Sequence, residues 1–369
     1  MTAPIWAVVA GGGTAGHVFP GIAIGRALVA AGHPPESIHF VGSRRGVDSD
    51  LVPAAGFDLT VLPGRGIRRR LTFDNVAAIT GLARGLWQAH RLLGRLRPRV
   101  VISLGGYASV PCAVAALLRR IPVVVAEQNA VPGAANRLVA RWARACAVSF
   151  AGTDLPRSVL TGNPVREEIL AVDRSAGRAA ARTRLEVPVD RHLIVVFGGS
   201  LGARRVNRAT VDACRILAGR GDLAVRHIVG DRDWEEVAES VVDEGALTRR
   251  LVRFENDMAS VFAAADLVVC RAGATSVAEL TVTGTPSVLV PLPGAPGDHQ
   301  SANARAVERT GGAVVVPDEE LDGPRLAELI TTLLGDPDRL ATMGAAAASM
   351  AHRDAAAAVA RLAEEYARA

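Results

Sequence analysis

Two glycine-rich segments of this 369-residue chain have the composition of phosphate-binding loops. The first, GGGTAGH, covers residues 11–17, and the second, GGSLGARRVN, covers residues 198–207. Each follows a short apolar run and precedes a segment of helical composition. Glycine lets backbone N–H groups approach a phosphate, and the N-terminus of the following helix adds partial positive charge. The two segments therefore predict a phosphate-bearing ligand such as a nucleotide.

The first segment also fits two other interpretations. Gly11, Gly13 and Gly16 satisfy the GxGxxG pattern of dinucleotide-binding oxidoreductases. An NAD site would need an acidic residue after the second strand, where the sequence has Ser43, Arg44 and Arg45, so that only an NADP-dependent oxidoreductase remains as the alternative function. A third interpretation is a glycine turn that merely packs a helix on a strand.

Four residues carry side chains suited to sugar-nucleotide chemistry. His17 lies at the mouth of a predicted helix, whose N-terminus favours a neutral imidazole that could accept a proton. The alternative is that His17 caps its own helix or binds a diphosphate. Glu279 follows Gly273 by six residues in CRAGATSVAEL and could accept hydrogen bonds from ribose hydroxyls, or it could be a solvated helix residue. Gln300 and Asn303 are three apart, so both amides can lie on one helix face.

Other polar residues show no such spacing. We interpret them as surface positions: His33, His39, His90, His192, His227, His352, Asp231 and Asp233.

Apolar runs alternate with longer amphipathic segments, which predicts βα units and parallel sheets. The predicted strands are residues 5–10, 38–41, 59–62, 100–103, 122–126 and 147–150, then 193–197, 224–229, 251–254, 267–270, 287–290 and 313–315. This is an α/β protein with two Rossmann-like domains. Since ligands of open α/β sheets bind beyond the carboxyl ends of the strands, we expect the site to lie between the two domains.

The domain boundary falls near Asn163, where TGNPVREEIL contains a glycine and a proline. Residues 171–184 read as a connector, and residues 340–369 as one or two closing helices. The expected domains are residues 1–163 with a final helix 354–369, and residues 164–353.

Composition excludes several classes of protein. With 49% hydrophobic and 21% charged residues the chain is not disordered, and it has no apolar run of membrane-spanning length. The start of the sequence does not resemble a signal peptide, so a cytoplasmic location is expected. The four cysteines lie far apart in apolar stretches and predict reduced core residues. Aromatic residues total only 4%, which argues against nucleic acid as a partner.

Seven segments carry a resemblance that covers nearly the whole chain. GGGTAGHVFPGIAIGRAL, SLGGYASVP, AEQNAVPGAANR, TGNPVR, GGSLGARRVN, CRAGATSVAEL and DHQSANA occur in the order and at about the spacing of a family of bacterial cell-wall glycosyltransferases. That family transfers N-acetylglucosamine (GlcNAc) from UDP-GlcNAc to lipid I, the undecaprenyl-diphosphate-linked MurNAc-pentapeptide, and so forms lipid II for peptidoglycan. The resemblance implies a GT-B fold, inverting transfer to the C4 hydroxyl of MurNAc, no metal or cofactor, and a C-terminal helix that returns to the first domain.

The resemblance also implies roles for individual residues. On the donor side it places Ser200 and Arg166 on the phosphates, backbone near Glu255 on the uracil, Ala274, Thr275, Ser276 and Val277 on the sugar-phosphate, Glu279 on the ribose, and Gln300, Asn303 and Asn129 on GlcNAc. On the acceptor side it makes His17 the candidate catalytic base and places Thr14, Ala15, Gly16 and Tyr107 near the substrate. Leu201 and His299 stand where other members carry glutamine.

Charge divides unevenly along the chain and predicts an anionic partner. Residues 1–165 contain 18 arginines and 7 acidic residues, whereas residues 166–369 contain 24 arginines and 30 acidic residues. In the basic part, Arg68, Arg69 and Arg70 precede a stripe of Val76, Ile79, Leu82 and Leu86 with Trp87 at its end. The stripe fits either an interfacial helix or a helix that faces its own core.

The resemblance favours the interfacial interpretation of this stripe. It implies a peripheral protein on the inner face of the cell membrane, bound to anionic phospholipid, with other cell-wall synthesis proteins as possible partners.

Overall fold

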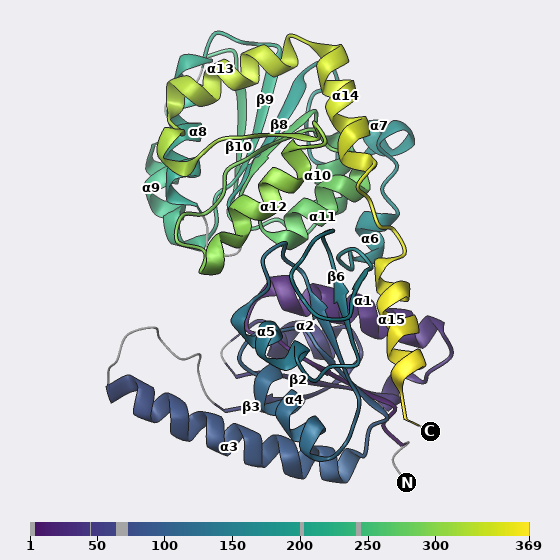
Figure 1. Ribbon diagram of the computed structural model, residues 1–369. Helices are drawn as coiled ribbons and strands as arrows, with labels where there is room; N and C mark the ends of the chain where they lie inside the picture. Colours follow the sequence, from purple (N-terminus) through teal and green to yellow (C-terminus); the bar gives the residue numbers. More distant parts are fainter. Residues whose placement is uncertain (1–3, 45, 64–72, 200–202, 241–244, 369) are drawn as a thin grey trace. The chain divides into compact units, whose positions relative to one another are not determined.

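The structure, a computed structural model, describes residues 4–44, 46–63, 73–199, 203–240 and 245–368. The chain divides into two compact units, which we call unit 1 (residues 1–166 and 352–369) and unit 2 (residues 167–351). Each unit has a parallel β-sheet covered by helices (Figure 1). The predicted α/β class with two Rossmann-like domains is therefore confirmed.

The described part of unit 1 has a sheet of strand order β3-β2-β1-β4-β5-β6-β7 with parallel neighbours. Its strands are β1 (Ala7–Ala10), β2 (Ile38–Ser43), β3 (Asp58–Leu62), β4 (Val100–Ser103), β5 (Val123–Glu127), β6 (Ala145–Val148) and β7 (Ser158–Leu160). Its helices are α1 (Ala15–Ala30), α2 (Asp48–Ala54), α3 (Phe73–Leu96), α4 (Ser109–Leu118), α5 (Ala134–Ala140) and α15 (Ala355–Tyr366), with a 3-10 turn at Pro35–Ser37.

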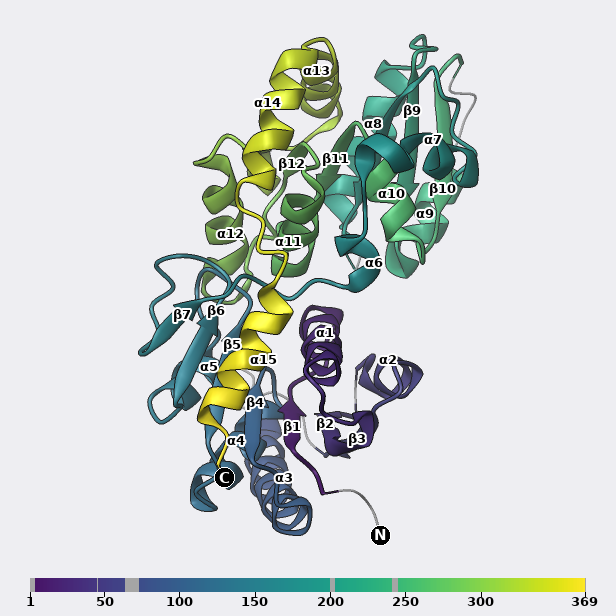
Figure 2. The same ribbon diagram turned by 90° about the vertical axis from the view of Figure 1, so that its right-hand side faces the viewer.

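Helices bury both faces of this sheet, because successive residues of a strand point to opposite sides. Val8 and Val101 pack with side chains of α3, α4 and α5, whereas Val9 and Ile102 pack with α1, α2 and α15. Helix α15 comes from the end of the chain, and it lies beside α1 against this sheet (Figures 1 and 2). Unit 1 is therefore assembled from two stretches of sequence.

The described part of unit 2 has the strand order β10-β9-β8-β11-β12-β13, again parallel. Its strands are β8 (His192–Phe197), β9 (Leu223–Ile228), β10 (Thr248–Val252), β11 (Leu267–Cys270), β12 (Ser287–Leu289) and β13 (Ala313–Val315). Its helices are α6 (Glu167–Leu170), α7 (Arg174–Arg184), α8 (Arg204–Ile216), α9 (Trp234–Glu239), α10 (Met258–Ala264), α11 (Ala274–Thr283), α12 (His299–Glu308), α13 (Gly323–Leu334) and α14 (Pro337–Ala348), with 3-10 turns at Asp231–Asp233, Pro296–Asp298 and Asp318–Glu320.

Both sheets reverse their strand order at one place. In unit 1 the chain runs outward from β1 in one direction and from β4 in the other, and in unit 2 it does so from β8 and β11. Ligands of doubly wound folds bind at such a switch point, beyond the carboxyl ends of the strands. The loops that follow β1, β4 and β11 are therefore the places to look for a site.

Every run predicted as a strand overlaps an observed strand, but two predictions about local structure need correction. The edge strand β7 was not predicted, because its three residues are exposed and carry no alternating pattern. Residues 171–184, predicted as a connector, mostly form helix α7. Asp173 caps α7 by accepting hydrogen bonds from the backbone N–H groups of Ser175 and Ala176.

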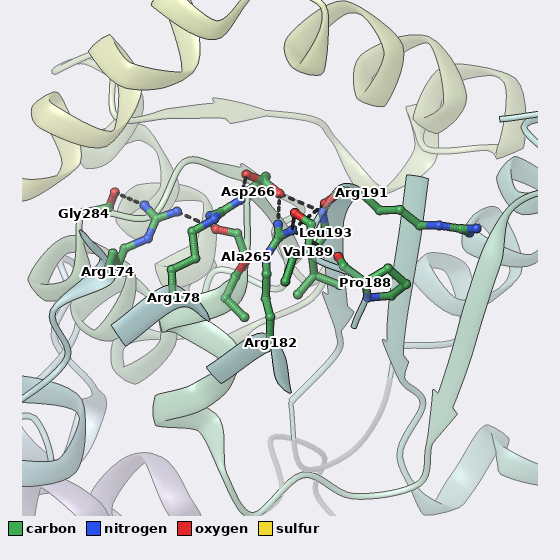
Figure 3. A network of polar contacts seen from close by, with 11 residues as sticks. Arg174, Arg178, Arg182, Pro188, Val189, Arg191, Leu193, Ala265, Asp266 and Gly284 are labelled. Atoms are coloured by element: carbon green, nitrogen blue, oxygen red, sulfur yellow. Dashed lines mark hydrogen bonds and ion pairs between the residues drawn. The ribbon is translucent and has the colours of Figure 1, made fainter. Parts of the chain in front are cut away.

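Three arginines on one face of α7 attach this helix to the segment before β11 and to the end of α11 (Figure 3). Arg178 and Arg182 both contact the carboxylate of Asp266, and the Arg182 pair measures 2.7 Å. Arg174 donates to the backbone carbonyls of Ala265 and Gly284. The spacing of four residues brings all three arginines to the same face.

Three of the polar residues interpreted as surface positions are in fact buried. His227 is 0% exposed, with Nε2 lying 3.0 Å from Asn207 Oδ1 and Nδ1 lying 3.1 Å from an Arg249 nitrogen. Asp233 is buried and accepts from the Asn207 amide, and buried His39 lies 2.8 Å from the Thr60 hydroxyl. All four cysteines are free and buried, as predicted.

Candidate functional site

The first glycine loop joins β1 to α1 in unit 1. Gly12 and Gly13 have φ angles of 133° and 93°, which only glycine adopts readily. Thr14 follows as the N-cap residue of α1, and Ala15 and Gly16 open the helix. The Thr14 hydroxyl lies 3.0 Å from Nδ1 of His17. The loop and its helix therefore hold this imidazole at the switch point of the sheet.

Another loop of unit 1, which follows β4 and contains Gly105 and Gly106, lies against the first glycine loop. A Cβ atom on Gly106 would be 2.7 Å from the carbonyl oxygen of Gly12. A Cβ atom on Gly105 would be 3.4 Å from Nε2 of His17 and 3.2 Å from Nδ2 of Asn136. Both glycines have positive φ. The absence of side chains at these two positions therefore lets this loop pack against Gly12 and beside Asn136, next to the His17 ring.

A buried carboxylate organises the other side of this region. Glu127, at the end of β5, is 3% exposed. Its Oε1 accepts from the backbone N–H and the side-chain amide of Asn129, at 2.9 and 3.2 Å. Its Oε2 accepts from the backbone N–H of Gly133 and from Nδ2 of Asn136, at 3.0 and 2.9 Å. The carboxylate thus fixes both asparagines.

The structure therefore brings two predicted acceptor-side residues together with Asn129, which was predicted to contact GlcNAc, and it adds two further residues. His17, Thr14 and Asn129 belong to one polar region, and Glu127 and Asn136 are its additional members. Both additional residues lie in the segment AEQNAVPGAANR. Its clustered amides and carboxylate are the sequence feature from which these two site residues could have been predicted. Buried polar atoms at Asn136 Oδ1 and the Tyr107 hydroxyl have no hydrogen-bond partner among the described residues. Burial also raises the pKa of Tyr107.

The predicted donor-side residues cluster around the start of α11 in unit 2. Gly273 is the N-cap residue, and Ala274, Thr275, Ser276 and Val277 form the first turn, whose N–H groups are suited to an anion. The Thr275 hydroxyl oxygen is buried and has no hydrogen-bond partner in the described ranges.

Helix α12 brings the two predicted amides to this region. Asn303 is 0% exposed and donates from Nδ2 to the carbonyl of Ala272, at 3.1 Å, so it lies directly against the loop before α11. Gln300, one turn earlier, accepts from the backbone N–H of Leu292 at 2.9 Å. Glu279 is 5% exposed, so it is not a solvated helix residue.

Glu255 and Arg166 take part in contacts of their own. The Glu255 carboxylate pairs with Arg226 at 2.6 Å and accepts from the backbone N–H of Asp257. Its side chain is thereby occupied, and only the backbone near it is left for the predicted uracil contact. Arg166 belongs to unit 1, and its guanidinium carbon lies 4.5 Å from the centre of the Phe19 ring. Ser200 lies outside the described residues.

The predicted membrane-facing stripe falls largely outside the described part of the chain. Arg68, Arg69 and Arg70 are not described, nor are the side chains of Val76, Ile79 and Leu82. Leu86 packs partly buried against the core of unit 1, which favours the alternative interpretation at this position. Trp87 is 58% exposed, and the guanidinium carbon of Arg91 lies 4.8 Å from the centre of its ring.

Comparisons with known proteins agree with this arrangement. Residues 7–148 match the glycosyltransferase family 28 N-terminal domain, and residues 193–359 match the glycosyltransferase family 28 C-terminal domain. Proteins named UDP-N-acetylglucosamine--N-acetylmuramyl-(pentapeptide) pyrophosphoryl-undecaprenol N-acetylglucosamine transferase are similar at full length. That from Moorella thermoacetica is 41% identical, covering 93% of this chain and 94% of the relative. That from Alkalilimnicola ehrlichii is 42% identical over the whole of both chains.

A solved structure of the same kind also matches. The crystal structure of MurG from Acinetobacter baumannii has a TM-score of 0.76 and 29% identity, and the match covers 98% of this chain and 99% of that one. Together these matches confirm the predicted GT-B fold class. They give no support to an NADP-dependent oxidoreductase.

Proposed function

This chain belongs to glycosyltransferase family 28, and we propose that it transfers GlcNAc from UDP-GlcNAc to lipid I to give lipid II. The observation that carries the proposal is the similarity, over at least 93% of both chains, to relatives named for this reaction. The domain pair of a glycosyltransferase and the clustered polar groups in each unit are consistent with it.

We assign the donor to unit 2. The N–H groups at the start of α11 would bind the diphosphate. The Thr275 hydroxyl, which has no partner among the residues that the structure describes, would add a donor there. Buried Glu279, in the second turn of the same helix, would accept hydrogen bonds from the ribose hydroxyls. Gln300 and Asn303 would bind the sugar, with Asn303 already fixed at the loop before α11. Ser200 and Arg166 are proposed phosphate ligands by resemblance alone.

We assign the acceptor to unit 1. His17 would take the proton from the C4 hydroxyl of MurNAc as that oxygen attacks the anomeric carbon, while the bond to UDP breaks with inversion. The contact between Thr14 and His17 supports this role, because a hydroxyl on Nδ1 orients the ring and leaves Nε2 toward the Gly105 loop. Tyr107 would line the same region, and Asn129, held by Glu127, would contact the GlcNAc of the donor from this unit.

The lipid-linked acceptor lies in a membrane, so we also propose peripheral association with the inner face of the cell membrane. None of the helices in the described ranges combines the length and apolar character that crossing a bilayer requires. The basic character of the first 165 residues supports attraction to anionic phospholipid. Exposed Trp87 supplies an aromatic group of the kind found at membrane interfaces.

The proposal is tested with purified protein and two ligand panels. Calorimetry in the presence of a metal chelator should detect binding of UDP-GlcNAc and UDP but not of NADP. Incubation with UDP-GlcNAc and lipid I should give lipid II and UDP in equal amounts. Binding of NADP in place of UDP-GlcNAc, or release of UDP without lipid II, would contradict the proposal.

A further inference from the structure

A buried carboxylate lies directly behind the first glycine loop. Asp48, the first residue of α2, is 2% exposed. Its Oδ2 accepts a hydrogen bond of 2.8 Å from the backbone N–H of Gly13. That N–H group belongs to the loop that the sequence predicted to bind a phosphate. One of the loop's donors is therefore already bound by the protein's own carboxylate.

Three glycines surround this carboxylate. A Cβ atom on Gly12 would lie 1.8 Å from Asp48 Oδ1, and one on Gly42 would lie 2.8 Å from the same oxygen. A Cβ atom on Gly46 would lie 2.5 Å from Oδ2. Real Cβ atoms do not approach other atoms this closely. The absence of a side chain at Gly12 is therefore required by Asp48, whereas the sequence alone suggested that the loop containing Gly12 serves a phosphate.

The hydrogen bond to Gly13 is connected to the candidate base by the chain itself. Gly13 precedes Thr14, whose hydroxyl lies 3.0 Å from His17 Nδ1. Asp48 and His17 also line the same small cavity, of about 10 Å³. A change in the peptide at Gly13 would move Thr14 and hence the orientation of the imidazole.

We propose that Asp48 is a positioning residue for the transfer reaction. It holds the first glycine loop, through the N–H of Gly13, in the positive-φ conformation that sets Thr14 and His17 for the acceptor. The effect of Asp48 on catalysis rests on the proposed function. Its hydrogen bond to the loop is independent of that function. Asp48 acts through hydrogen bonding, so an oxygen acceptor of the same shape should replace it.

The test compares three variants of the full-length protein. Asp48→Ala removes the acceptor, and Asp48→Asn keeps an oxygen that can accept from Gly13. Asp50→Ala is the matched control, because Asp50 is an exposed acidic residue in the same first turn of α2. For each variant we would measure amide hydrogen exchange of the segment containing Gly13, the affinity for UDP, thermal unfolding, and kcat and KM for lipid I.

In Asp48→Ala we expect exchange at Gly13 to accelerate about tenfold, since one hydrogen bond to a charged acceptor is lost. We expect kcat for lipid I to fall about a hundredfold, as misplacement of a catalytic group does, with UDP affinity unchanged. Asp48→Asn should restore protection at Gly13 and most of the turnover. Asp50→Ala should resemble the wild type.

Three outcomes would overturn the inference. The first is wild-type exchange and turnover in Asp48→Ala. The second is a folded Asp48→Ala variant that unfolds at lower temperature but keeps wild-type kcat, which would make Asp48 a stabilising residue only. The third is a folded Asp48→Asn variant that has lost about a hundredfold in kcat, like Asp48→Ala. If Asp48→Ala does not fold, the activity of Asp48→Asn alone tests the inference. Lack of lipid II formation by the wild type would instead contradict the proposed function and leave the exchange test intact.

Discussion

Replacing Asp266 with alanine should destabilise unit 2 by about 3 kcal/mol. The Asp266 carboxylate pairs with Arg178 and Arg182 and accepts from the backbone N–H of Leu193 at 2.7 Å. The Arg182 side chain is only 3% exposed, and burial lowers the pKa of its guanidinium. Removing one partner of a buried ion pair typically costs about 3 to 5 kcal/mol, because the other charge stays buried.

The lower end of that range applies for a structural reason. Arg182 also donates to the backbone carbonyls of Val189 and Arg191, at 2.9 and 2.7 Å, and these acceptors remain in the variant. Arg178 is about one-third exposed, so water can replace its lost partner. With a urea slope of about 2 kcal/mol/M, the unfolding midpoint of unit 2 should fall by about 1.5 M.

Urea unfolding must be observed in unit 2 alone, because two units need not unfold together. Trp234 is the single tryptophan in unit 2, whereas Trp6, Trp87 and Trp142 belong to unit 1. Changing those three to phenylalanine makes Trp234 fluorescence a specific probe.

Asp212→Ala in the same background is the control, because Asp212 pairs with Arg215 on the surface and should contribute less than about 1 kcal/mol. An Asp266→Ala midpoint no lower than that of Asp212→Ala would refute the reasoning.

Four further predictions concern pH, catalysis and the membrane. Burial lowers the pKa of His227 to about 3, below its unfolded value near 6.5, so the unfolded state takes up a proton first and the stability of unit 2 should fall by about 1.4 kcal/mol per pH unit as pH drops from 6.5 toward 3. A His227→Gln variant should lose this slope in urea titrations. Glu279→Ala should weaken the binding of UDP and of UDP-GlcNAc, each by about 1.5 to 3 kcal/mol in calorimetry. A UDP affinity equal to that of the wild type would rule out the ribose contact. His17→Ala should lower kcat by about a hundredfold to ten-thousandfold with donor binding retained; a loss below about tenfold would indicate a structural histidine. Ile79→Glu combined with Arg69→Glu should reduce co-sedimentation with anionic vesicles at unchanged UDP-GlcNAc affinity, whereas unfolding of that variant would show that the stripe is core.

The regular elements were predictable because burial and pattern agreed along the central strands. The run at Leu267–Cys270 was predicted to the residue, since four buried apolar residues leave little choice. Helix α7 was missed because its outer positions are alanine, arginine and threonine. Only the structure shows that Arg178 and Arg182 of this helix bind the carboxylate of Asp266, which lies more than 80 residues later in the sequence.

The site was predictable where one residue type implies a chemistry and unpredictable where partners are distant in sequence. His17 and the Gly273 helix start were identified from local pattern. The role of Asp48 could not be, because Gly13 lies 35 residues before it and the carboxylate looks like an ordinary first-turn acid. His227 was misassigned for the same reason, since its partners Asn207 and Arg249 come from separate elements.

The return of α15 to unit 1 has a consequence for biosynthesis. Val359, Ala360 and Ala363 complete one face of that core, yet they are translated after all of unit 2. At about 5 to 20 residues per second, roughly 10 to 40 s separate the two parts of unit 1 on the ribosome. During that interval the nascent first half exposes the apolar groove that α15 later fills. Unit 2, which is continuous in sequence, can finish folding first, so the order of maturation is expected to be the reverse of the order of synthesis.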